Sequence, residues 1–458
     1  MAKVKTYELV APDGGYGYII LTCVFVNLSM LSAYANCYGI IYKDFFSELG
    51  MDSTNITSLN GVNSMSCAIG SLMTSFFLKR LSKRKMALIG ATLWNSGLFC
   101  TVFAQSKIIL FIFQGVTQSL GQGIIFNISS TALNDYFVKK RSLAVSVSQT
   151  LLAVLCLVAP QFFKWSINVF GHRNSLIWLC ALSVHMIIAA TLTQPVSWHM
   201  KKIEISPKEQ ELKILLNENN MNHTTKALND STSIDVDRLQ TITEDNKQKK
   251  IGGFLNDLID FKLIKSFLLS IECGGATFVM TIEFIFLMIL PQALQSCEFN
   301  WSEDDTAMAF TLVAVGDLSM RILMIVFNKL MNKWGSRPIY VFGIMLAFVT
   351  RIGILTSNSQ ILTFILLTLM GMSRCIILVV IILVVSESVK EDEFSAAIGI
   401  FMGAIGILNL TIGPLLGAIR DYTDSYIITF YLMTAIMGAV GVLWILKNIC
   451  VKKRKILQ

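Results

Sequence analysis

Long apolar stretches recur along the chain, each about as long as a helix that crosses a membrane. Such a helix needs about 20 mainly apolar residues to cross the hydrocarbon core of a bilayer. Because the stretches are continuous and do not alternate over about ten residues, they predict helices and not the strands of a membrane barrel. The twelve stretches cover approximately residues 18–42, 58–79, 86–106, 108–134, 142–168, 173–195, 263–294, 304–330, 337–356, 360–387, 394–419 and 425–448. The pattern predicts an all-α membrane protein with twelve transmembrane helices.

A polar segment in the middle of the chain divides the apolar stretches into two sets of six. It is rich in Lys, Glu, Asn, Asp, Ser and Thr, and such a composition cannot bury enough apolar surface to fold alone, so we expect it to be mostly disordered. The pattern therefore predicts an N-terminus (1–17), a six-helix bundle (18–195), this loop (196–262), a second six-helix bundle (263–449) and a basic tail (450–458).

The two halves resemble each other at an offset of about 250 residues. The segments 78-LKRLSKRKMALIG-90 and 330-LMNKWGSRPIYVFG-343 are both short basic turns that lead directly into the next helix. The segments 141-RSLAVSVSQT-150 and 393-EFSAAIGIFM-402 correspond in the same way. Six helices followed by six more in a parallel repeat is the arrangement of the major facilitator fold, whose substrate site lies near the midplane between the halves.

Lysine and arginine residues are concentrated in every second loop. Most of the 38 lie in segments that share one side with both termini, and the other side holds Lys43, Lys107, Lys164, Arg173 and Arg420. Because an excess of positive charge marks the cytoplasmic side, both termini are predicted to be cytoplasmic. The net charge of +8 then reflects topology and gives no reason to expect a nucleic acid as partner.

Two opposite charges, Asp317 and Arg321, lie within the apolar run 309-AFTLVAVGDLSMRILMIVF-327. Residues four apart share one face of a helix, so the two can pair. The chain is 54% hydrophobic and only 15% charged, and a charge within a membrane span costs free energy, faces the bundle interior and commonly marks a substrate or proton path. An ion pair that only joins two helices is the alternative interpretation.

Other polar residues also lie within the predicted spans. Glu283 and Arg374 have no partner nearby in the sequence and are expected either to pair across the second bundle or to face a cavity. Arg351, nearer an outer end, is expected to extend its charged group toward the membrane surface. Tyr34 and Asn127 lie on facing helices of the first bundle, and each is either a packing and hydrogen-bonding residue or a contact for a bound molecule.

The sequence lacks the motifs of several other kinds of chemistry. It has no Walker-type glycine loop, no His-Glu-X-X-His and no nucleophile elbow. The sequence therefore lacks the usual motifs of ATP-driven pumps and of hydrolases. The ten cysteines and four histidines show no spacing typical of a metal site. We therefore expect neither a cofactor nor a metal, and no enzymatic activity.

Four segments resemble, in order and at matching spacing, motifs of the monocarboxylate transporter family. They are 11-APDGGYGY-18, 136-YFVKKRSLA-144, 334-WGSRP-338 and 394-FSAAIG-399. The first differs from the usual family form, which has tryptophan where this chain has Tyr16 and Tyr18. The similarity covers roughly residues 11–195 and 263–449.

Asp317 and Arg321 are similar to an aspartate and an arginine in the eighth helix of that family. The resemblance implies that Arg321 holds the substrate carboxylate, since a guanidinium offers a bidentate fork to a planar anion. It also implies that Asp317 pairs with Arg321 in one state and releases it in another. Counted from the first motif, Asn36 stands where proton-coupled members have a lysine. Because asparagine does not titrate, this departure argues against lactate as substrate and against obligatory proton symport.

Two groups of residues near the cytoplasmic side are candidates for conformational roles. Asp13 is expected to cap the first helix, and Gly14 and Gly15 to let that helix approach a neighbour closely. Lys140 and Arg141 are interpreted either as gating contacts of an alternating-access cycle or as anchors that fix the topology.

The sequence thus predicts a secondary transporter of the plasma membrane that carries a small carboxylate-bearing metabolite, a monocarboxylate or related organic anion, by alternating access. The alternatives are a proton-independent facilitator of aromatic amino acids or similar zwitterions, a metabolite sensor with a transporter-like fold, and a channel. The expected partners are the carboxylate substrate, membrane lipid and, if transport is proton-coupled, a proton. The resemblance adds a single-span ancillary glycoprotein that assists delivery to the cell surface.

Overall fold

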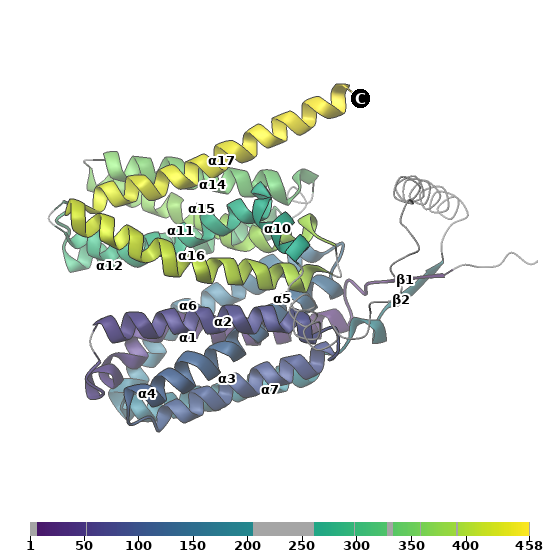
Figure 1. Ribbon diagram of the computed structural model, residues 1–458, viewed down its shortest axis with the longest axis horizontal. Coiled ribbons are helices and arrows are strands. Elements are labelled where there is room, and N and C mark those ends of the chain that lie inside the picture. The colour runs from purple at the N-terminus through teal and green to yellow at the C-terminus, as the bar shows by residue number, and fades with distance from the viewer. Residues whose placement is uncertain are drawn as a thin grey trace, which may run out of the picture.

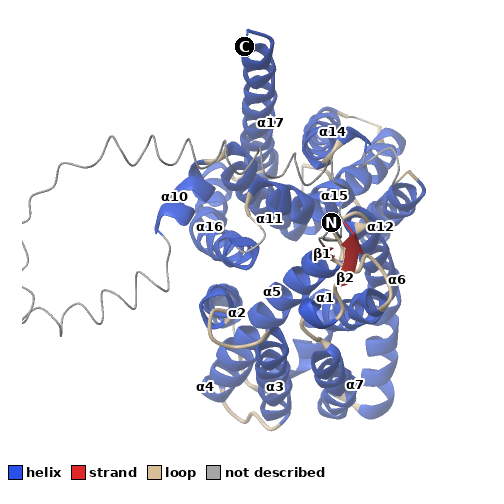
Figure 2. Ribbon diagram, turned by 90° about the vertical axis from the view of Figure 1, so that its right-hand side faces the viewer, coloured by secondary structure: helices blue, strands red, loops and turns tan. Residues whose placement is uncertain are grey.

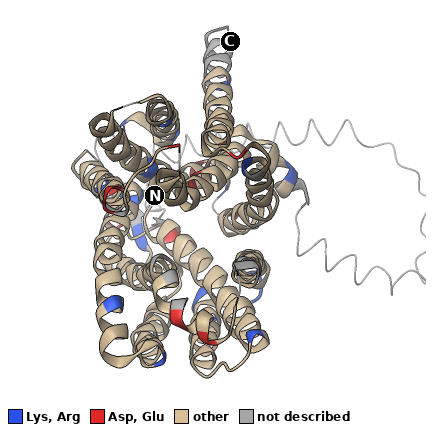
Figure 3. Ribbon diagram, turned by 90° about the vertical axis from the view of Figure 1, so that its left-hand side faces the viewer, with Lys and Arg blue, Asp and Glu red and all other residues tan. Residues whose placement is uncertain are grey.

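Two bundles of long helices lie side by side, one from each half of the chain (Figure 1). The computed structural model describes residues 7–51, 53–204, 261–296, 298–327, 333–357, 359–390 and 393–457. Few charged residues lie along the helices (Figure 3), which suits surfaces that face either lipid or other helices.

The first bundle contains six long helical segments. In the fourth, α4, the π-helical η1 and α5 form one continuous stretch, Lys107–Tyr136. The elements are α1 (Tyr16–Glu48), α2 (Ser53–Phe77), α3 (Lys83–Val102), α4 (Lys107–Leu110), η1 (Phe111–Gln118), α5 (Ser119–Tyr136), α6 (Arg141–Phe170) and α7 (His172–Leu192). Within the bundle, α5 packs against both α2 and α3, and α1 packs against α6 and α7.

The second bundle has the same number of long segments. Its elements are α10 (Phe261–Leu269), the π-helical η3 (Ile271–Gly275), α11 (Ala276–Gln295), α12 (Glu303–Val326), α14 (Ser336–Thr356), α15 (Gln360–Ser388), α16 (Phe394–Thr423) and α17 (Tyr426–Leu457). The last helix continues through the region that was expected to begin a basic tail at residue 450.

Each of the twelve predicted stretches overlaps one long helical segment of the described chain, and the stretch 263–294 also includes most of the short helix α10. The predicted fold class is therefore confirmed. Among the described residues, ten segments are long and apolar enough to cross a membrane by length and composition. The other two, α2 and α3, are less apolar. Helix α2 carries serine, threonine and asparagine along its length, and Ser66, Ser71 and Thr74 are buried. Polar side chains of this kind are accommodated where helices face one another and can form hydrogen bonds.

The two bundles repeat the same close contacts between helices. A Cβ added to Gly123 of α5 would lie 1.9 Å from the carbonyl oxygen of Cys67 in α2. In the second bundle, a Cβ added to Gly371 of α15 would lie 2.1 Å from the carbonyl oxygen of Val313 in α12. Small residues let helix backbones approach this closely in membranes. The spacing of about 250 residues between the two contacts is the offset that the sequence predicts.

A small sheet connects the N-terminus to the start of the central loop, and it was not predicted. Strand β1 (Tyr7–Val10) pairs in antiparallel fashion with β2 (Lys201–Glu204), so that Val10 lies opposite Lys201 (Figure 2). A short 3₁₀ helix, Val196–Trp198, precedes β2. Pairing between segments so far apart in the sequence leaves no local pattern, so the sequence did not predict this sheet. Residues 205–260 lie outside the described chain, and the expected disorder there stays a prediction.

A second ion pair is sealed within the C-terminal bundle. Arg351 Nη2 in α14 lies 2.5 Å from Glu283 Oε2 in α11, and the guanidinium carbon lies 4.0 Å from the centre of the Phe286 ring. Arg351 is 0% exposed, so the expectation that it extends toward the membrane surface was wrong. The pairing also resolves the alternatives for Glu283, whose partner lies two helices away in the sequence. Neither residue lines the cavity that lies between the two bundles.

The close contact at Gly123 gives a prediction about stability. Gly123→Ala is expected to destabilise the fold by about 1–3 kcal/mol or more, because the new methyl group meets backbone atoms and forces α2 and α5 apart. The measurement is the melting temperature of the detergent-purified protein. Gly413→Ala is the matched control, since a Cβ at Gly413 in α16 would meet nothing within 4 Å. Equal melting temperatures for the two variants would contradict this packing.

The sealed ion pair predicts an asymmetry between its two partners. Glu283→Gln leaves a guanidinium buried without a counter-ion and is expected to cost about 3–5 kcal/mol of stability. Arg351→Met leaves a carboxyl group, which can take up a proton and become neutral, so its melting temperature should fall less. Comparison of the two melting temperatures tests the pair, and a larger fall for Arg351→Met would count against it.

Candidate functional site

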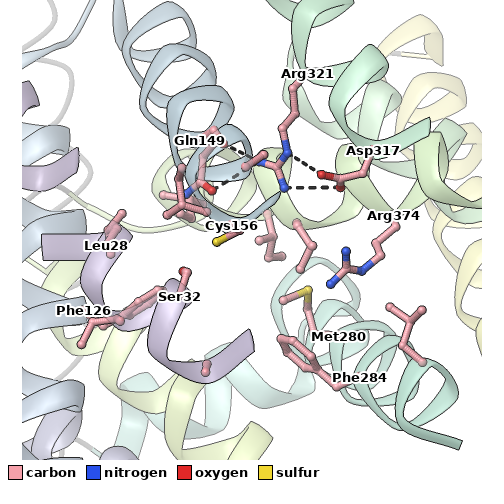
Figure 4. Close-up of a pocket in the computed structure, with 18 of the residues that line it drawn as sticks. Leu28, Ser32, Phe126, Gln149, Cys156, Met280, Phe284, Asp317, Arg321 and Arg374 are labelled. Carbon is pink, nitrogen blue, oxygen red and sulfur yellow. Dashed lines mark hydrogen bonds and ion pairs between the residues drawn. The ribbon is translucent and has the colours of Figure 1, made fainter. Parts of the chain in front are cut away.

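A cavity of about 670 Å³ lies between the two bundles. Helices α1, α2, α5 and α6 line it from the first bundle, and α11, α12, α15 and α16 line it from the second. Its wall is largely apolar, with Leu28, Phe126, Met280 and Phe284 among the residues drawn in Figure 4. Pockets for small molecules commonly have this size and an apolar lining with a few polar groups.

Asp317 and Arg321 form an ion pair in the wall of this cavity. Arg321 Nε lies 2.7 Å from Asp317 Oδ2, and Nη2 lies 3.3 Å from Oδ1 (Figure 4). Both side chains are buried. The one-turn spacing on α12 places the two groups on the same face, as the sequence predicts.

Arg321 also reaches across to the other bundle. Its Nη1 donates a hydrogen bond to the backbone oxygen of Gln149 in α6 (3.1 Å) and lies 3.4 Å from Gln149 Oε1. The guanidinium therefore connects α12 of the second bundle with α6 of the first. Sequence reasoning missed Gln149. The available signal was a polar side chain in a span, within a segment that repeats between the two halves.

A second arginine, Arg374 of α15, also lines the cavity. Its Nε is buried and has no hydrogen-bond partner among the described residues. Arg374 was expected either to pair across the second bundle or to face a cavity. In the structure it faces the cavity. Among the described lining residues, the charged ones are Asp317, Arg321 and Arg374. One carboxylate with two guanidiniums leaves this wall with a net positive charge.

The structure places two predicted site residues outside the cavity lining. The Tyr34 hydroxyl accepts a hydrogen bond from Gln114 Nε2 (3.2 Å) and lies 3.2 Å from the Tyr42 hydroxyl, inside the first bundle. Asn127 Nδ2 donates to the backbone oxygen of Ser395 (3.0 Å), and its Oδ1 accepts from the Ser395 hydroxyl (2.8 Å). Asn127 thus joins α5 to α16. For both residues, these contacts agree with the interpretation as packing and hydrogen-bonding residues. The side chain of Asn36 in α1 lies outside the described part of the structure.

Asp13 caps a different segment from the one expected. Its Oδ1 accepts hydrogen bonds from the backbone N–H groups of Val138 (2.9 Å), Lys139 (3.0 Å) and Lys140 (3.2 Å). These residues form the turn before α6, whereas the N-cap of α1 is Gly15 and forms no side-chain capping bond. The expectation that Asp13 caps the first helix was therefore wrong. The carboxylate instead satisfies backbone donors at the turn between α5 and α6.

Gly14 and Gly15 also act differently from the expectation. Gly15 has a φ of +59°, and Gly14 has a φ of +156°. A Cβ at Gly15 would meet nothing within 4 Å, so a close approach does not require glycine there. The left-handed backbone of Gly15 does require it, because this conformation is unfavourable for side chains with a Cβ.

Hydrogen bonds near the cytoplasmic ends of the helices hold the bundles together. Arg141 Nη1 donates to the Ser386 hydroxyl of α15, and that hydroxyl donates to Asn134 Oδ1 of α5 (2.7 Å). The backbone N–H of Lys140 donates to Asp13. The packing around Gly413, at the outer end of α16, is looser: a Cβ added there would meet no atom within 4 Å. Of the two predicted gating residues, Arg141 lies at a contact between the bundles.

The chain matches known membrane transporters in sequence. It matches the family model of the Major Facilitator Superfamily over residues 20–228 and 273–455. It is 23% identical to Monocarboxylate transporter 13 of Rattus norvegicus over 186 residues, which is 41% of this chain and 44% of that protein. It is also 23% identical to Monocarboxylate transporter 1 of Bos taurus over 443 residues, covering 94% of this chain and 84% of that protein. The match to the first of these relatives thus spans less than half of its length.

Solved structures share the fold at low sequence identity. The proton:xylose symporter XylE, bound to 6-bromo-6-deoxy-D-glucose, superposes with a TM-score of 0.65 at 14% identity, covering 93% of this chain and 94% of that one. The human organic anion transporter MFSD10 gives a TM-score of 0.64 at 11% identity, covering 93% and 98% of the two chains. These likenesses bear on the fold alone.

The family model covers most of the chain, and the named relatives confirm the resemblance predicted from the sequence. Together with the two six-helix bundles, these matches indicate a membrane transporter that crosses the bilayer several times. The chain belongs to the Major Facilitator Superfamily.

Proposed function

We propose that this transporter carries a small carboxylate-bearing metabolite across the plasma membrane by alternating access. One observation carries the proposal: the Asp317–Arg321 pair lies in the wall of a cavity between the bundles, and Arg321 also contacts Gln149 of the opposite bundle. A guanidinium at such a position can bind a carboxylate and at the same time respond to the separation of the bundles. The names of the sequence relatives support the same substrate class.

In the proposed cycle, Arg321 exchanges partners. In the conformation described here its donors contact Asp317 and Gln149, and Arg141 holds the cytoplasmic ends together through Ser386. When the bundles separate on that side, Arg321 loses Gln149 and gains donors for an anion in the cavity. Rocking of one bundle against the other around a fixed central site is the usual form of alternating access in this type of fold.

A proton-independent facilitator of aromatic amino acids or similar zwitterions is the second candidate. The aromatic residues Phe126, Phe284 and Phe310 in the cavity wall favour a substrate with a ring. Asn36 favours independence from protons, since an amide side chain cannot exchange one at neutral pH. Asp317 is the carboxylate among the described lining residues, so it is the group that would receive the ammonium of an amino acid.

Reconstitution into proteoliposomes tests the transport function. Uptake of lactate, ketone bodies, aromatic carboxylates and aromatic amino acids would be measured at two pH values. We expect saturable uptake of at least one carboxylate, accelerated by the same compound inside the vesicles. Binding without uptake would favour a metabolite sensor, and flux that does not saturate would favour a channel. Either result would contradict the proposal.

The role of the ion pair predicts the effect of two substitutions. Arg321→Ala is expected to abolish transport and to leave surface expression largely intact, because the remaining carboxyl group of Asp317 can protonate and stay buried. Asp317→Asn is expected to be at least as damaging, since arginine cannot neutralise itself. Uptake normalised to protein at the cell surface is the measurement. Wild-type uptake by either variant would remove the pair from the proposed site.

Asn36 predicts weak dependence on a proton gradient. Uptake by the unmodified chain should change little when an inward proton gradient is imposed, because Asn36 has no proton to exchange and both oxygens of Asp317 contact Arg321. Asn36→Lys introduces a group that can titrate within an apolar helix and should make uptake more dependent on the gradient. Strong accumulation against a concentration gradient by the unmodified chain, driven by protons alone, would show that this prediction is wrong.

A further inference from the structure

Three arginines of the second bundle, Arg321, Arg351 and Arg374, lie inside membrane-spanning helices and away from their first and last turns, and they differ in how their charge is balanced. Arg321 lies 2.7 Å from an oxygen of Asp317, and Arg351 lies 2.5 Å from an oxygen of Glu283. Arg374 forms no ion pair with a described residue, and its buried Nε has no hydrogen-bond partner there. An unpaired cation within a membrane is unfavourable and is retained where it has a function.

We infer that Arg374 binds the carboxylate of the substrate in this conformation, and that the substrate is a singly charged carboxylate with a bulky apolar body. This inference rests on the proposed transport function and assigns it a binding residue and a substrate class. The free hydrogen-bond donors of Arg374 support this assignment. Arg321 uses Nε and Nη2 on Asp317 and Nη1 on Gln149. The donors of Arg374 are not used by described residues, so its planar fork can receive a carboxylate through two hydrogen bonds.

The charge of the cavity wall argues for one negative charge on the substrate. Asp317 and Arg321 neutralise each other, which leaves the single positive charge of Arg374 among the described lining residues. A second carboxylate would find no second unpaired cation there. The ammonium group of an amino acid would need the oxygens of Asp317, which both contact Arg321.

The shape and lining of the cavity argue for a bulky apolar body. Figure 4 shows the guanidinium of Arg374 pointing toward Met280 and Phe284 of α11. Further apolar side chains of the wall are Phe126, Phe310, Phe401 and Met402. A volume of about 670 Å³ is in the range of pockets for drug-sized ligands, and a three-carbon acid would leave most of it empty. Each apolar group that a larger acid adds would strengthen binding, because its removal from water is favourable in free energy.

The two arginines have separate tasks. Arg374 lies on α15 of the second bundle and, among the described residues, forms no hydrogen bond or ion pair with the first bundle. Arg321 contacts Gln149 of that bundle. We therefore assign initial binding of the carboxylate to Arg374, and coupling between the bound substrate and the movement of the bundles to Arg321. Loss of Arg374 should raise KM more than it lowers kcat, whereas loss of Arg321 should lower kcat.

The test measures binding to the purified full chain in detergent by isothermal titration calorimetry. The probes are 3-phenylpropionate, its neutral amide, phenylalanine and lactate, which vary the charge, the ammonium group and the apolar body separately. The variants are Arg374→Met and Arg374→Lys. The control is Arg420→Gln, which removes an arginine at the outer end of α16 that does not line the cavity. Melting temperature is recorded for each protein.

The wild-type chain should bind 3-phenylpropionate more tightly than the amide, phenylalanine or lactate. Arg374→Met should weaken binding of 3-phenylpropionate at least about tenfold, the lower end of the range for a hydrogen bond to a charged group. Its melting temperature should be equal or higher, because an unpaired and partly buried cation has been removed. Arg374→Lys should keep the preference for the acid over the amide, and Arg420→Gln should keep wild-type affinity.

Three results would overturn the inference. The first is wild-type affinity for 3-phenylpropionate in Arg374→Met. The second is a large fall in melting temperature of that variant, which would assign Arg374 a structural role. The third is tighter binding of phenylalanine or lactate than of 3-phenylpropionate, which would contradict the substrate class. In each case carboxylate uptake by the wild-type chain could still stand. Absence of that uptake would instead contradict the proposed function itself.

Discussion

The need to balance charge inside an apolar environment is the constraint on which this structure depends. Arg351 and Glu283 meet it within the C-terminal bundle, where the pair is sealed and joins α14 to α11. Asp317 and Arg321 meet it at the boundary of the two bundles, where Arg321 also contacts Gln149. The first arrangement suits a permanent contact. The second can change when the bundles move, because one of its partners belongs to the other bundle.

The conformation described here combines this central pair with contacts on the cytoplasmic side. Arg141 contacts Ser386, and Asn127 contacts Ser395, so two hydrogen-bonded points join the bundles there. Asp13 orders the turn that precedes Arg141, because its carboxylate accepts hydrogen bonds from the backbone N–H groups of that turn. In a carrier that works by alternating access, such contacts must break for the cytoplasmic side to open. Their strength therefore contributes to the rate of that step.

Much of the fold could be predicted from the sequence, because the length of an apolar run decides whether a helix can cross a membrane. The i, i+4 spacing also identified the pairing of Asp317 with Arg321. Contacts between distant segments could not be predicted in this way. The partner of Glu283, the pairing of β1 with β2 and the capping role of Asp13 all depend on residues far away in the chain, and no local pattern identifies them.

The central claim is that the bundles separate on the cytoplasmic side in response to a carboxylate in the cavity. The most direct measurement is the distance between spin labels on Lys140 and Lys390, which are exposed near the Arg141–Ser386 contact. The account predicts a short distance for the conformation described here, a second and longer distance, and a change in their proportions when a transported carboxylate is added. A single distance that no transported carboxylate changes would contradict it.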